Sequence, residues 1–525
     1  MGAERSEDAS GVRLSDLLCG LTLVMDLGMA RRPGESLFSC LVTTGFARAL
    51  NLDPTTVADA YHASLLRHVG CTAFAHETAL LLGDDVRVNE AGSRTDFSDV
   101  RDVFATFLPG VTAGAAPMRR LRLTAATFLN GPVIDRDGHR ANCEVAAQMA
   151  DRLGLGAGVG GALTQMFEWW NGKGGPRGLA GDDIRLATRL THVASTAALF
   201  HGIGGTAMAL AMLERRSGTL LDPALVADFH RHGPDLLGEA ADADPTRAVL
   251  DAEPRPVRRL TPDGVDEAAR AFGDMVDLKS PYLHGHSAGV AESAHRAGVR
   301  LGLPEASDGR LRTAGWTHDL GRVAVSSGVW DRPGALDEGE WEQVRLHAYY
   351  SERILRRCPP LAAVARLAGS HHERCDGTGY HRGLESGEIP MAVCVLAAAD
   401  ELTALRAARP HRAALDLDEA ARVLRAHARE GALEAEAAEA VLGAAGHDGA
   451  RGGRRVWPAG LTDRQVQVLR LLCEGLTNRQ IAGRLDVSPR TAEHHVQDVY
   501  AKIGVSSRAA AAMFAMRHAV LSSTP

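Results

Sequence analysis

Residues 371–384 read His-His-Glu-Arg-Cys-Asp-Gly-Thr-Gly-Tyr-His-Arg-Gly-Leu, a pair of histidines followed by a glycine-rich loop. A second stretch, residues 168–179, reads Glu-Trp-Trp-Asn-Gly-Lys-Gly-Gly-Pro-Arg-Gly-Leu and matches residues 373–384 at six of twelve positions. Alanine-rich helices often resemble one another weakly, but a shared loop of glycine and arginine is a stronger sign of common origin. We therefore predict a duplicated domain, with residues 371–384 in its second copy.

Shorter matches upstream support the duplication. Leu66-Arg-His-Val-Gly70 aligns with Thr317-His-Asp-Leu-Gly321 at an offset of 251 residues, and residues 49–53 align with residues 300–304 at the same offset. Residues near 84–135 are predicted to be an insertion in the first copy. Apolar residues recur at spacings of three and four, and alternating runs are few, so the predicted fold class is all-α.

Two segments of linker-like composition divide the chain. Residues 241–262 are rich in proline and charge, and residues 443–460 are rich in glycine and arginine. A chain of 525 residues is too long for one core, since domains usually hold roughly 100–200 residues. We predict tandem helical domains at residues 1–240 and 263–442 and a small domain at residues 461–525.

The composition excludes several classes of protein. Apolar residues make up 45% and charged residues 23%, which excludes a fibrous or wholly disordered chain. The eight cysteines form no Cys-x-x-Cys pair, so reduced thiols are expected. Residues 196–213, the most apolar stretch, are interrupted by His201, and no secretory leader is evident, so we expect a cytoplasmic protein with no membrane partner. The net charge of −7 is uneven, because residues 461–525 carry +3, which permits nucleic-acid binding there.

Histidines and aspartates occur in a defined order in the second copy. Imidazole nitrogen and carboxylate oxygen together suit first-row metals such as Fe, Mn, Zn or Ni. A single histidine is more often an ordinary core or surface residue, but the ordered set predicts a dinuclear site. Two ions roughly 3.5–4 Å apart would clamp the attacking and leaving oxygens of phosphoester hydrolysis. The candidate metal ligands are His286, His318, Asp319, His347, His371, His372 and Asp400.

Residues 276–415 resemble the HD-GYP family, a branch of the HD metal-dependent phosphohydrolases. The motifs that carry the resemblance are Ser280-Pro-Tyr-Leu-His-Gly-His286, Trp316-Thr-His-Asp-Leu-Gly-Arg322, Arg345-Leu-His347, residues 371–384 and Ala398-Ala-Asp400. The resemblance implies an HD helical core, two divalent ions on the ligand set, and hydrolysis of cyclic di-GMP or a related nucleotide. It favours Fe or Mn over Zn or Ni. It also implies catalytic roles for Asp319 and Arg322, and a substrate loop that contains Gly377, Gly379, Tyr380 and Arg382.

Three positions depart from the family pattern. The lysine of the family's His-Asp motif is Arg322, which keeps the charge but does not readily donate a proton, since its pKa lies above about 12. The Gly-Tyr-Pro signature reads Gly379-Tyr380-His381, and we expect His381 on the loop surface, with a substrate contact as the alternative. An acidic position is lost in Thr403-Ala-Leu-Arg406. The ligand set is complete, so metal binding is expected, while hydrolysis depends on whether Arg322 suffices.

The first copy lacks the ligand set. Methionine and phenylalanine cannot hold a hard or borderline metal, so this half is not expected to bind one. A Glu35–Arg67 ion pair is expected in the vacated space. The half is either structural and dimer-forming or a sensory pocket, and the sequence leaves both open. The aligned replacements are Glu35 for His286, Arg67-His68 for His318-Asp319, Met166-Phe167 for His371-His372, and Ser195 for Asp400.

Residues 461–521 are predicted to form four helices. Thr462 with Gln465 and Thr477 with Gln480 form capping boxes, and Ser488 caps a third helix. A short helix, a tight turn and a second helix with a polar face form a helix-turn-helix, whose second helix enters the major groove of DNA.

This segment resembles the LuxR-type (GerE-like) DNA-binding domain over its whole length, through Gly475-Leu-Thr-Asn-Arg-Gln-Ile-Ala482, His495 and Lys502-Ile-Gly-Val505. Among the residues that the resemblance implies as DNA contacts, the basic ones favour phosphates and the others favour bases or backbone. Glu493 stands where a basic residue is common, and either accepts a hydrogen bond from cytosine or weakens binding. The small positive charge predicts that double-stranded DNA is bound by a homodimer; a domain used only for dimerisation is the alternative. The implied DNA contacts are Arg479, Arg490, Thr491, Glu493, His494, Gln497 and Lys502.

The sequence thus predicts a bacterial transcriptional regulator whose DNA-binding domain is controlled by a metal-dependent phosphohydrolase domain. One alternative is a cyclic-dinucleotide phosphodiesterase whose DNA-binding tail only localises it. Another is a metal-bound but inactive nucleotide sensor. The two alternatives differ in whether the protein hydrolyses its nucleotide. Only the regulator is expected to change its affinity for DNA when the nucleotide binds.

Overall fold

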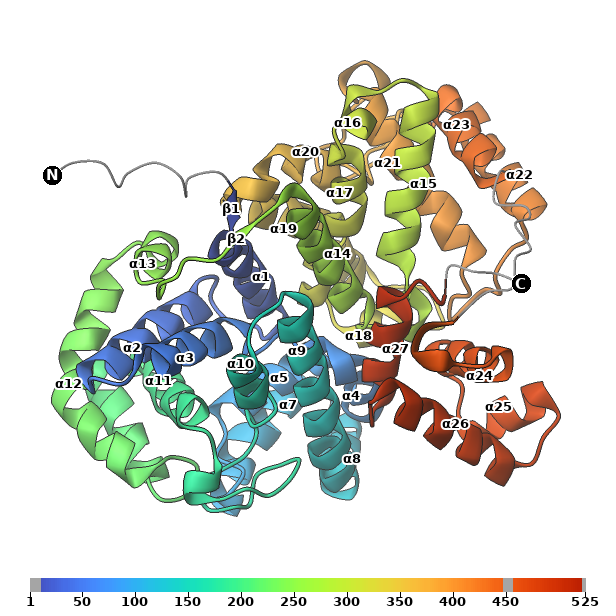
Figure 1. Ribbon diagram of the computed structural model, residues 1–525. Coiled ribbons are helices and arrows are strands. Elements are labelled where there is room, and N and C mark those ends of the chain that lie inside the picture. The colour runs from blue at the N-terminus through green and yellow to red at the C-terminus, as the bar shows by residue number, and fades with distance from the viewer. Residues whose placement is uncertain (1–10, 447–456, 522–525) are drawn as a thin grey trace, which may run out of the picture.

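The computed structural model describes residues 11–446 and 457–521. Helices dominate these residues, which confirms the predicted all-α fold class. The exception is a two-stranded antiparallel sheet that pairs β1 (Val12–Arg13) with β2 (Arg259–Leu260). Figure 1 shows two helical halves side by side, with the C-terminal helices packed against both.

The first half wraps α1 and α2 with helices from much later in the sequence. Helix α11 packs against both α2 and α3, and α12 covers α2. Its helices are α1 (Leu14–Gly28), α2 (Glu35–Ala49), α3 (Pro54–Leu66), α4 (Ala75–Leu82), α5 (Asp85–Arg94), α6 (Val100–Asp102), α7 (Leu108–Thr112), α8 (Pro117–Val133), α9 (His139–Arg152), α10 (Ala157–Leu163), α11 (Leu186–Arg216), α12 (Pro223–Asp242) and α13 (Pro245–Asp251).

The second half is built around α15, which packs against α14, α17, α21 and α23. Alanine and glycine on α15 allow this close packing: a Cβ added at Gly289 would lie 3.0 Å from the Thr403 side chain on α21. The helices are α14 (Pro262–Asp277), α15 (His286–Arg300), α16 (Pro304–Ser307), α17 (Arg310–Thr317), α18 (Ser327–Trp330), α19 (Glu338–Arg357), α20 (Ala365–Gly369), α21 (Met391–Arg406), α22 (Leu417–Arg429) and α23 (Ala435–Ala445).

The two halves share a local design. In each glycine-rich loop a buried glutamate accepts two backbone hydrogen bonds, Glu168 from Arg177 and Leu179, and Glu373 from Arg382 and Leu384. The helices α2 and α15 also begin alike, since each follows a glycine with positive φ, 98° at Gly34 and 82° at Gly285. These parallels support the duplication that we propose for residues 1–240 and 263–442.

The segment predicted as the first linker, residues 241–262, is packed structure. It contains the end of α12, the whole of α13 and the strand β2. The Val249 carbonyl accepts a hydrogen bond of 3.1 Å from buried Tyr61, and Ser15 Oγ lies 2.7 Å from Glu253 Oε1. The segment is therefore packed against the first half, unlike the linker that its composition suggested. Of the second predicted linker, residues 443–460, residues 447–456 lie outside the described residues.

The segment predicted as an insertion, residues 84–135, holds α5 to α8 and a small core of its own. Buried Asp85 joins it to the second half, because Lys279 Nζ lies 2.6 Å from Asp85 Oδ2. Ser326 Oγ and the Ser327 backbone also donate to Asp85. Asp85 therefore accepts hydrogen bonds from Ser326 and Ser327 in addition to its ion pair with Lys279.

Helix α11 is long and apolar enough to cross a membrane. A single helix of this length and composition is weak evidence of a membrane span, because core helices of soluble proteins share these properties. Gly204 and Gly205 depart from helical geometry inside it. The residues before this break include the buried Leu190, Val193 and Ala197. The first part of α11 is thus a core element of the first half.

The C-terminal domain consists of α24 (Asp463–Cys473), α25 (Asn478–Leu485), α26 (Pro489–Ile503) and α27 (Arg508–Arg517). Both predicted capping boxes are present, at Thr462–Gln465 and Thr477–Gln480, and Ser488 caps α26. Helix α27 packs against α9 of the first half and α14 of the second. The C-terminal domain therefore contacts both halves through its last helix, α27.

Candidate metal centre

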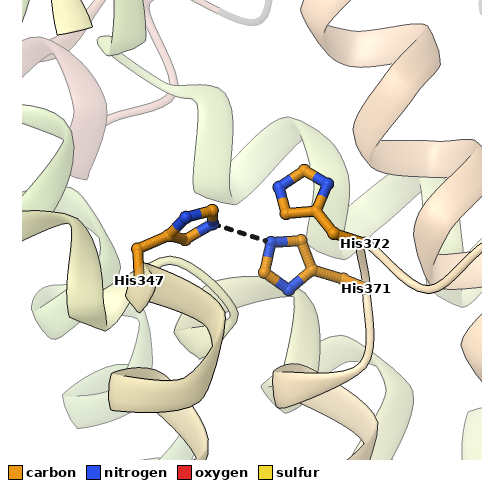
Figure 2. Close-up of side chains that lie close together, drawn as sticks. All are labelled: His347, His371 and His372. Carbon is orange, nitrogen blue, oxygen red and sulfur yellow. Dashed lines mark hydrogen bonds between the residues drawn. The ribbon is translucent and has the colours of Figure 1, made fainter. Parts of the chain in front are cut away.

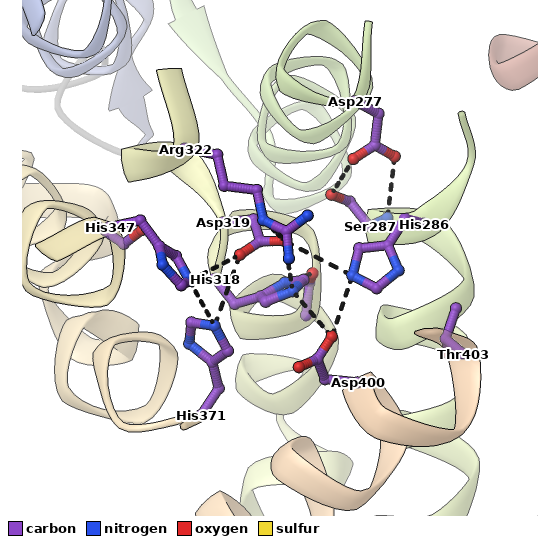
Figure 3. Close-up of polar contacts among 12 residues, drawn as sticks. Asp277, His286, Ser287, His318, Asp319, Arg322, His347, His371, Asp400 and Thr403 are labelled. Carbon is purple, nitrogen blue, oxygen red and sulfur yellow. Dashed lines mark hydrogen bonds and ion pairs between the residues drawn. The ribbon is translucent and has the colours of Figure 1, made fainter. Parts of the chain in front are cut away.

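The candidate ligands of the second half converge on one buried cluster (Figure 3). His286 begins α15, His318 and Asp319 follow α17, and His347 lies on α19. His371 and His372 follow α20, and Asp400 lies on α21. Three groups within the cluster have ligand atoms close enough to share an ion: His347, His371 and His372; His286, His318 and Asp400; and His318, Asp319 and His371.

Asp319 lies between the two sides of the cluster. Its Oδ1 is 3.3 Å from His347 Nε2 and 3.5 Å from His371 Nε2. Its Oδ2 is 3.1 Å from His318 Nε2 and 3.5 Å from His286 Nε2. One carboxylate oxygen thus faces each group of histidines, as a ligand that bridges two ions would.

Three histidines are oriented in the same way by the backbone. Nδ1 of His318 donates to Gly315 O at 2.7 Å, Nδ1 of His371 donates to Ala368 O at 2.6 Å, and Nδ1 of His347 donates to Val344 O. Each carbonyl lies three residues earlier in the chain. A hydrogen bond at Nδ1 fixes the tautomer in which Nε2 carries a free lone pair, the form that binds metals.

Figure 2 shows that His347 and His371 direct these Nε2 atoms at each other, 3.3 Å apart, with His372 beside them. Two lone pairs this close repel one another unless a cation or a proton lies between them. On the other side, His286 Nε2 is 3.1 Å from Asp400 Oδ1, and His372 Nδ1 is 3.9 Å from Asp400 Oδ2. The arrangement is therefore suited to positive charge at the centre of the cluster.

Burial makes these groups costly without a cation. Both oxygens of Asp319, both ring nitrogens of His286, His318 Nε2 and Asp400 Oδ1 are buried and have no hydrogen-bond partner. Burial lowers the pKa of His286 and of His371 to about 4, so both are neutral and able to bind a metal. Unpaired buried polar groups are unfavourable. The donor set thus fits divalent ions.

The carboxylates of the cluster are charged. Burial raises the pKa of Asp319, but the positive charge of Arg322 outweighs it and holds the pKa well below its usual range. Burial likewise raises the pKa of Asp400, but the close contact with His286 outweighs burial and holds that pKa well below its usual range. Burial lowers the pKa of His318, but the Asp319 charge raises it to about 9. The negative charge of Asp319 thus draws positive charge to the side of His318, where a bound cation would take the place of the proton on Nε2.

Arg322 lies against the cluster. Its Nε is 2.7 Å from Asp319 Oδ2, an ion pair that lacks hydrogen-bond alignment. Its guanidinium stacks 4.5 Å from the centre of the Trp330 ring, and Trp330 Nε1 donates to Arg322 O. Trp330 was not singled out by the sequence analysis, because its role depends on α18 folding back over the cluster.

The residues of the predicted substrate loop have different environments. Tyr380 stacks on His372, with ring centres 4.8 Å apart, so it borders the cluster. Arg382 is used internally, since its guanidinium binds Ser370 Oγ and Glu352. Gly377 has a positive φ of 75°, and a Cβ at Gly379 would lie 2.3 Å from the Arg374 nitrogen. Both glycines are therefore required by the loop geometry.

Two further groups lie near the cluster. Buried Asp277 accepts hydrogen bonds from the Ser287 backbone at 2.9 Å and from Ser287 Oγ at 2.8 Å, which holds the start of α15 next to His286. Burial, followed by the charge of Arg322, lowers the pKa of Arg409 to about 10. The sequence carries Arg409 in the segment after Asp400, but its position near the cluster depends on the turn between α21 and α22.

In the first half, Glu35 does not form the expected ion pair with Arg67. Glu35 Oε1 lies 2.6 Å from Arg31 Nη1 instead. Arg31 precedes α2 by one turn, so the local pair forms more readily than the long-range one. The prediction overlooked Arg31 because it has no counterpart among the metal ligands.

The predicted DNA contacts lie on or beside α25 and α26. Arg479, Arg490, Thr491, Glu493, His494 and Gln497 are exposed. Lys502 is also exposed, but its Nζ donates to Gly460 O at 3.0 Å and to Gln465 Oε1 at 2.9 Å. The predicted DNA-contact residues of α26 are thus accessible, while Lys502 is engaged within its own domain.

Two family models match separate parts of the chain. Residues 270–436 match the HD domain family, and residues 459–515 match the luxR family of bacterial regulatory proteins. The first match covers the whole cluster, and the second covers the four C-terminal helices almost completely.

Relatives extend the likeness to the first half. The chain is 30% identical over 414 residues to 3'3'-cGAMP-specific phosphodiesterase 3 of Vibrio cholerae, an alignment that covers 78% of this chain and 90% of that protein. An alignment of 414 residues is longer than the HD and luxR matches together, so it includes residues of the first half. The chain is also 33% identical over 162 residues to the cyclic di-GMP phosphodiesterase of Thermotoga maritima, covering 30% of this chain and 44% of that protein.

A solved structure is similar as well. The crystal structure of a cyclic GMP-AMP-specific phosphodiesterase of V. cholerae superposes with a TM-score of 0.56 at 27% identity. The superposition covers 83% of this chain and 98% of the other.

Proposed function

The chain belongs to the HD-GYP family of HD-domain phosphodiesterases, and on that premise we propose that residues 263–442 hydrolyse a cyclic dinucleotide and thereby control DNA binding by residues 461–525. The observation that carries the proposal is the cluster around Asp319, in which buried histidines direct their Nε2 atoms at one carboxylate. The first substrate candidate is 3'3'-cyclic GMP-AMP, because the relative that aligns over 90% of its length is named for it. Cyclic di-GMP is the second candidate.

Two divalent ions would be held by the seven candidate ligands. Fe or Mn is expected first and Zn or Ni second, because nitrogen and oxygen donors are mixed and no thiolate is present in the ligand set. One ion would bind His347, His371 and His372, and the other His286, His318 and Asp400, with Asp319 between them. Bound ions of this kind activate water and neutralise charge on a phosphoryl group.

Side chains of the chain itself would orient the substrate. Arg322 and Arg409 place two cations beside the cluster, where they would neutralise phosphodiester oxygens. Tyr380 presents an aromatic ring next to His372, a surface on which a nucleobase can stack. Gly377, Gly379 and Arg382 would serve by shaping the loop that carries Tyr380.

Control of DNA binding is supported by the contacts that precede the first ligand. His284 Nδ1 lies 2.7 Å from Cys473 O on α24, and the Gly285 backbone donates to Met516 Sδ on α27. His286 follows directly. A shift of His286 when metal or nucleotide binds would therefore be transmitted to the DNA-binding domain through two neighbouring residues.

The last helix of that domain is covered. Ala510, Ala511, Ala512 and Ala515 on α27 are fully buried, and Arg270 donates to Met516 O at 2.8 Å. A helix-turn-helix domain usually binds DNA as a dimer. We propose that the chain acts as a homodimer and that release of α27 contributes to dimer formation. The first half would be a degenerate copy, and a cytoplasmic location is consistent with this function.

The proposal is tested by comparing two measurements on protein of known metal content. Hydrolysis of 3'3'-cyclic GMP-AMP and cyclic di-GMP is followed with Mn, Fe, Zn or no added metal. Binding to a set of promoter DNA fragments is followed with and without the nucleotide that is hydrolysed. Turnover together with nucleotide-dependent DNA affinity supports the regulator. Turnover with constant DNA affinity supports the tail that only localises the enzyme, and nucleotide binding without turnover supports the sensor.

A further inference from the structure

The first half contains a buried cluster of basic side chains at the place that corresponds to the metal ligands. Arg31 lies just before α2, Arg67 and His68 follow α3, and His192 lies on α11. These three helices pack against one another. The cluster is therefore enclosed by the same kind of helix arrangement that encloses the ligands of the second half.

Several donors of this cluster are unused. Arg67 Nη1, His68 Nε2 and Arg31 Nε are buried and have no hydrogen-bond partner among the described residues. His68 is 8% exposed, and the side chain of Arg31 is 6% exposed. The Arg67 guanidinium forms no ion pair or hydrogen bond with any described residue. An unpaired guanidinium at such a position is unfavourable unless an anion accompanies it.

The acidic groups nearby do not supply that anion. Glu35 is paired with Arg31, and Asp26 accepts the Gly34 backbone at 2.8 Å and the Ser36 backbone at 3.3 Å. Burial raises the pKa of Asp26 to about 6, and its carboxylate is hydrogen-bonded to the backbone of Gly34 and Ser36 and not to Arg67. Burial, followed by the charge of Arg31, lowers the pKa of Arg67 to about 9, and burial followed by the charges of Arg67 and Arg31 lowers the pKa of His68. Arg67 thus lies near two carboxylates without a hydrogen bond to either, and its Nη1 is left without a partner among the described residues.

We propose that the first half binds a phosphoryl anion between Arg31, Arg67 and His68, in the position where the second half holds its metal ligands. A guanidinium donates two parallel hydrogen bonds to a phosphate, and a neutral imidazole with a proton on Nε2 adds a third. The anion is either inorganic phosphate or the terminal phosphate of a linear nucleotide. The proposal does not depend on hydrolysis in the second half, because it concerns different residues.

Calorimetric titration of the full chain tests the site. Inorganic phosphate is one probe, and a linear dinucleotide with a 5'-phosphate is the other. Arg67→Gln removes the unpartnered cation, and Arg32→Gln is the matched control, because Arg32 is exposed and adjacent to Arg31. We expect Arg67→Gln to weaken binding of at least one probe by roughly tenfold or more, while Arg32→Gln leaves it unchanged. Binding of both probes that is equal in the two variants would overturn the proposal.

Thermal unfolding gives a second measurement that does not rely on a weak titration signal. In phosphate-free buffer, Arg67→Met is expected to raise the melting temperature, because it removes an unpaired guanidinium whose Nη1 is buried. Added phosphate is expected to stabilise the natural chain and not the variant, since a ligand stabilises only the form that binds it. Loss of stability in Arg67→Met that is the same with and without phosphate would mean that Arg67 is a packing residue, and the proposal would fail.

Discussion

Arg322 Nε lies 2.7 Å from Asp319 Oδ2, so the cation that stands in the place of the family lysine is held against the carboxylate proposed to bridge two ions. The Arg322 side chain also stacks on Trp330. Asp319 is thereby kept charged, but the oxygen that contacts Arg322 is also one that would bind a metal ion. Arg322 and a bound metal ion would therefore compete for Asp319 Oδ2.

Replacement of Arg322 by lysine is expected to raise metal occupancy and turnover. A lysine cannot stack on Trp330 as a planar guanidinium does, so it competes less with metal for Asp319 Oδ2. Metal content after dialysis and turnover are measured for Arg322→Lys and for Arg366→Lys, an exposed control on α20. Metal content that is equal in both variants would show that Arg322 does not compete for the carboxylate.

Loss of single ligands should remove ions in groups. His347→Ala is expected to lower metal content by about one ion per chain, since its group contains three histidines. Asp319→Asn is expected to lower the content of both ions, because its two oxygens face both groups. Elemental analysis of Mn-loaded protein measures the ratio, with the exposed His230→Ala as control. Equal loss in His347→Ala and Asp319→Asn would contradict the bridging position.

The buried ion pair between Lys279 and Asp85 should be important for stability. Lys279→Met leaves Asp85 charged and buried, which costs about 3–5 kcal/mol when one partner of a buried pair is removed. Denaturant unfolding measures the change. The double variant Lys279→Met/Asp85→Leu is expected to recover part of the loss. A double variant as unstable as the sum of both single variants would mean that the two side chains do not interact.

The pair of His76 and Asp331 predicts a pH dependence of stability. Nδ1 of His76 lies 2.5 Å from Asp331 Oδ2; burial lowers the pKa of His76, but the hydrogen bond to Asp331 outweighs it and raises the pKa. A histidine whose pKa is raised on folding contributes stability that is full below its unfolded pKa of about 6.5 and is lost as the pH rises through the folded pKa.

We therefore expect His76→Gln to cost more free energy of unfolding near pH 6 than near pH 9. Denaturant unfolding at several pH values checks this, with exposed His411→Gln as control. A cost that is constant over this range would show that His76 is not charged in the folded protein.

His284 should link the metal site to the DNA-binding domain. Its Nδ1 lies 2.7 Å from Cys473 O. His284→Ala is expected to reduce the change in DNA affinity that nucleotide binding causes, while DNA affinity without nucleotide changes little. Fluorescence anisotropy with labelled DNA measures both values, and the exposed Glu474→Gln serves as control. Nucleotide dependence that is as large in His284→Ala as in the natural chain would exclude this route.

The sequence identified the residues that gather in the cluster of the second half, because most of these candidate ligands occur in short motifs where a helix begins or ends. His318 and Asp319 are adjacent in sequence, and the backbone carbonyl that orients His318 lies three residues away, so local geometry determines their presentation. The capping boxes of the C-terminal domain were predictable for the same reason.

Contacts between distant segments were not predictable in this way. Trp330 and Arg409 reach the cluster through tertiary packing, and neither carries a local signal of that position. Residues 241–262 have the composition of a linker, but Val249 and Glu253 are held by hydrogen bonds from the first 61 residues. Composition describes the intrinsic preference of a segment, while its packing depends on the surfaces that surround it.

Turnover of 3'3'-cyclic GMP-AMP by Mn- or Fe-loaded protein, compared with an Asp319→Asn variant of the same protein, tests whether the cluster is a catalytic metal centre. We expect the natural chain to release a linear dinucleotide, and we expect Asp319→Asn to lose both that activity and its metal. Metal-loaded protein that hydrolyses neither 3'3'-cyclic GMP-AMP nor cyclic di-GMP, or a variant as active as the natural chain, would contradict it.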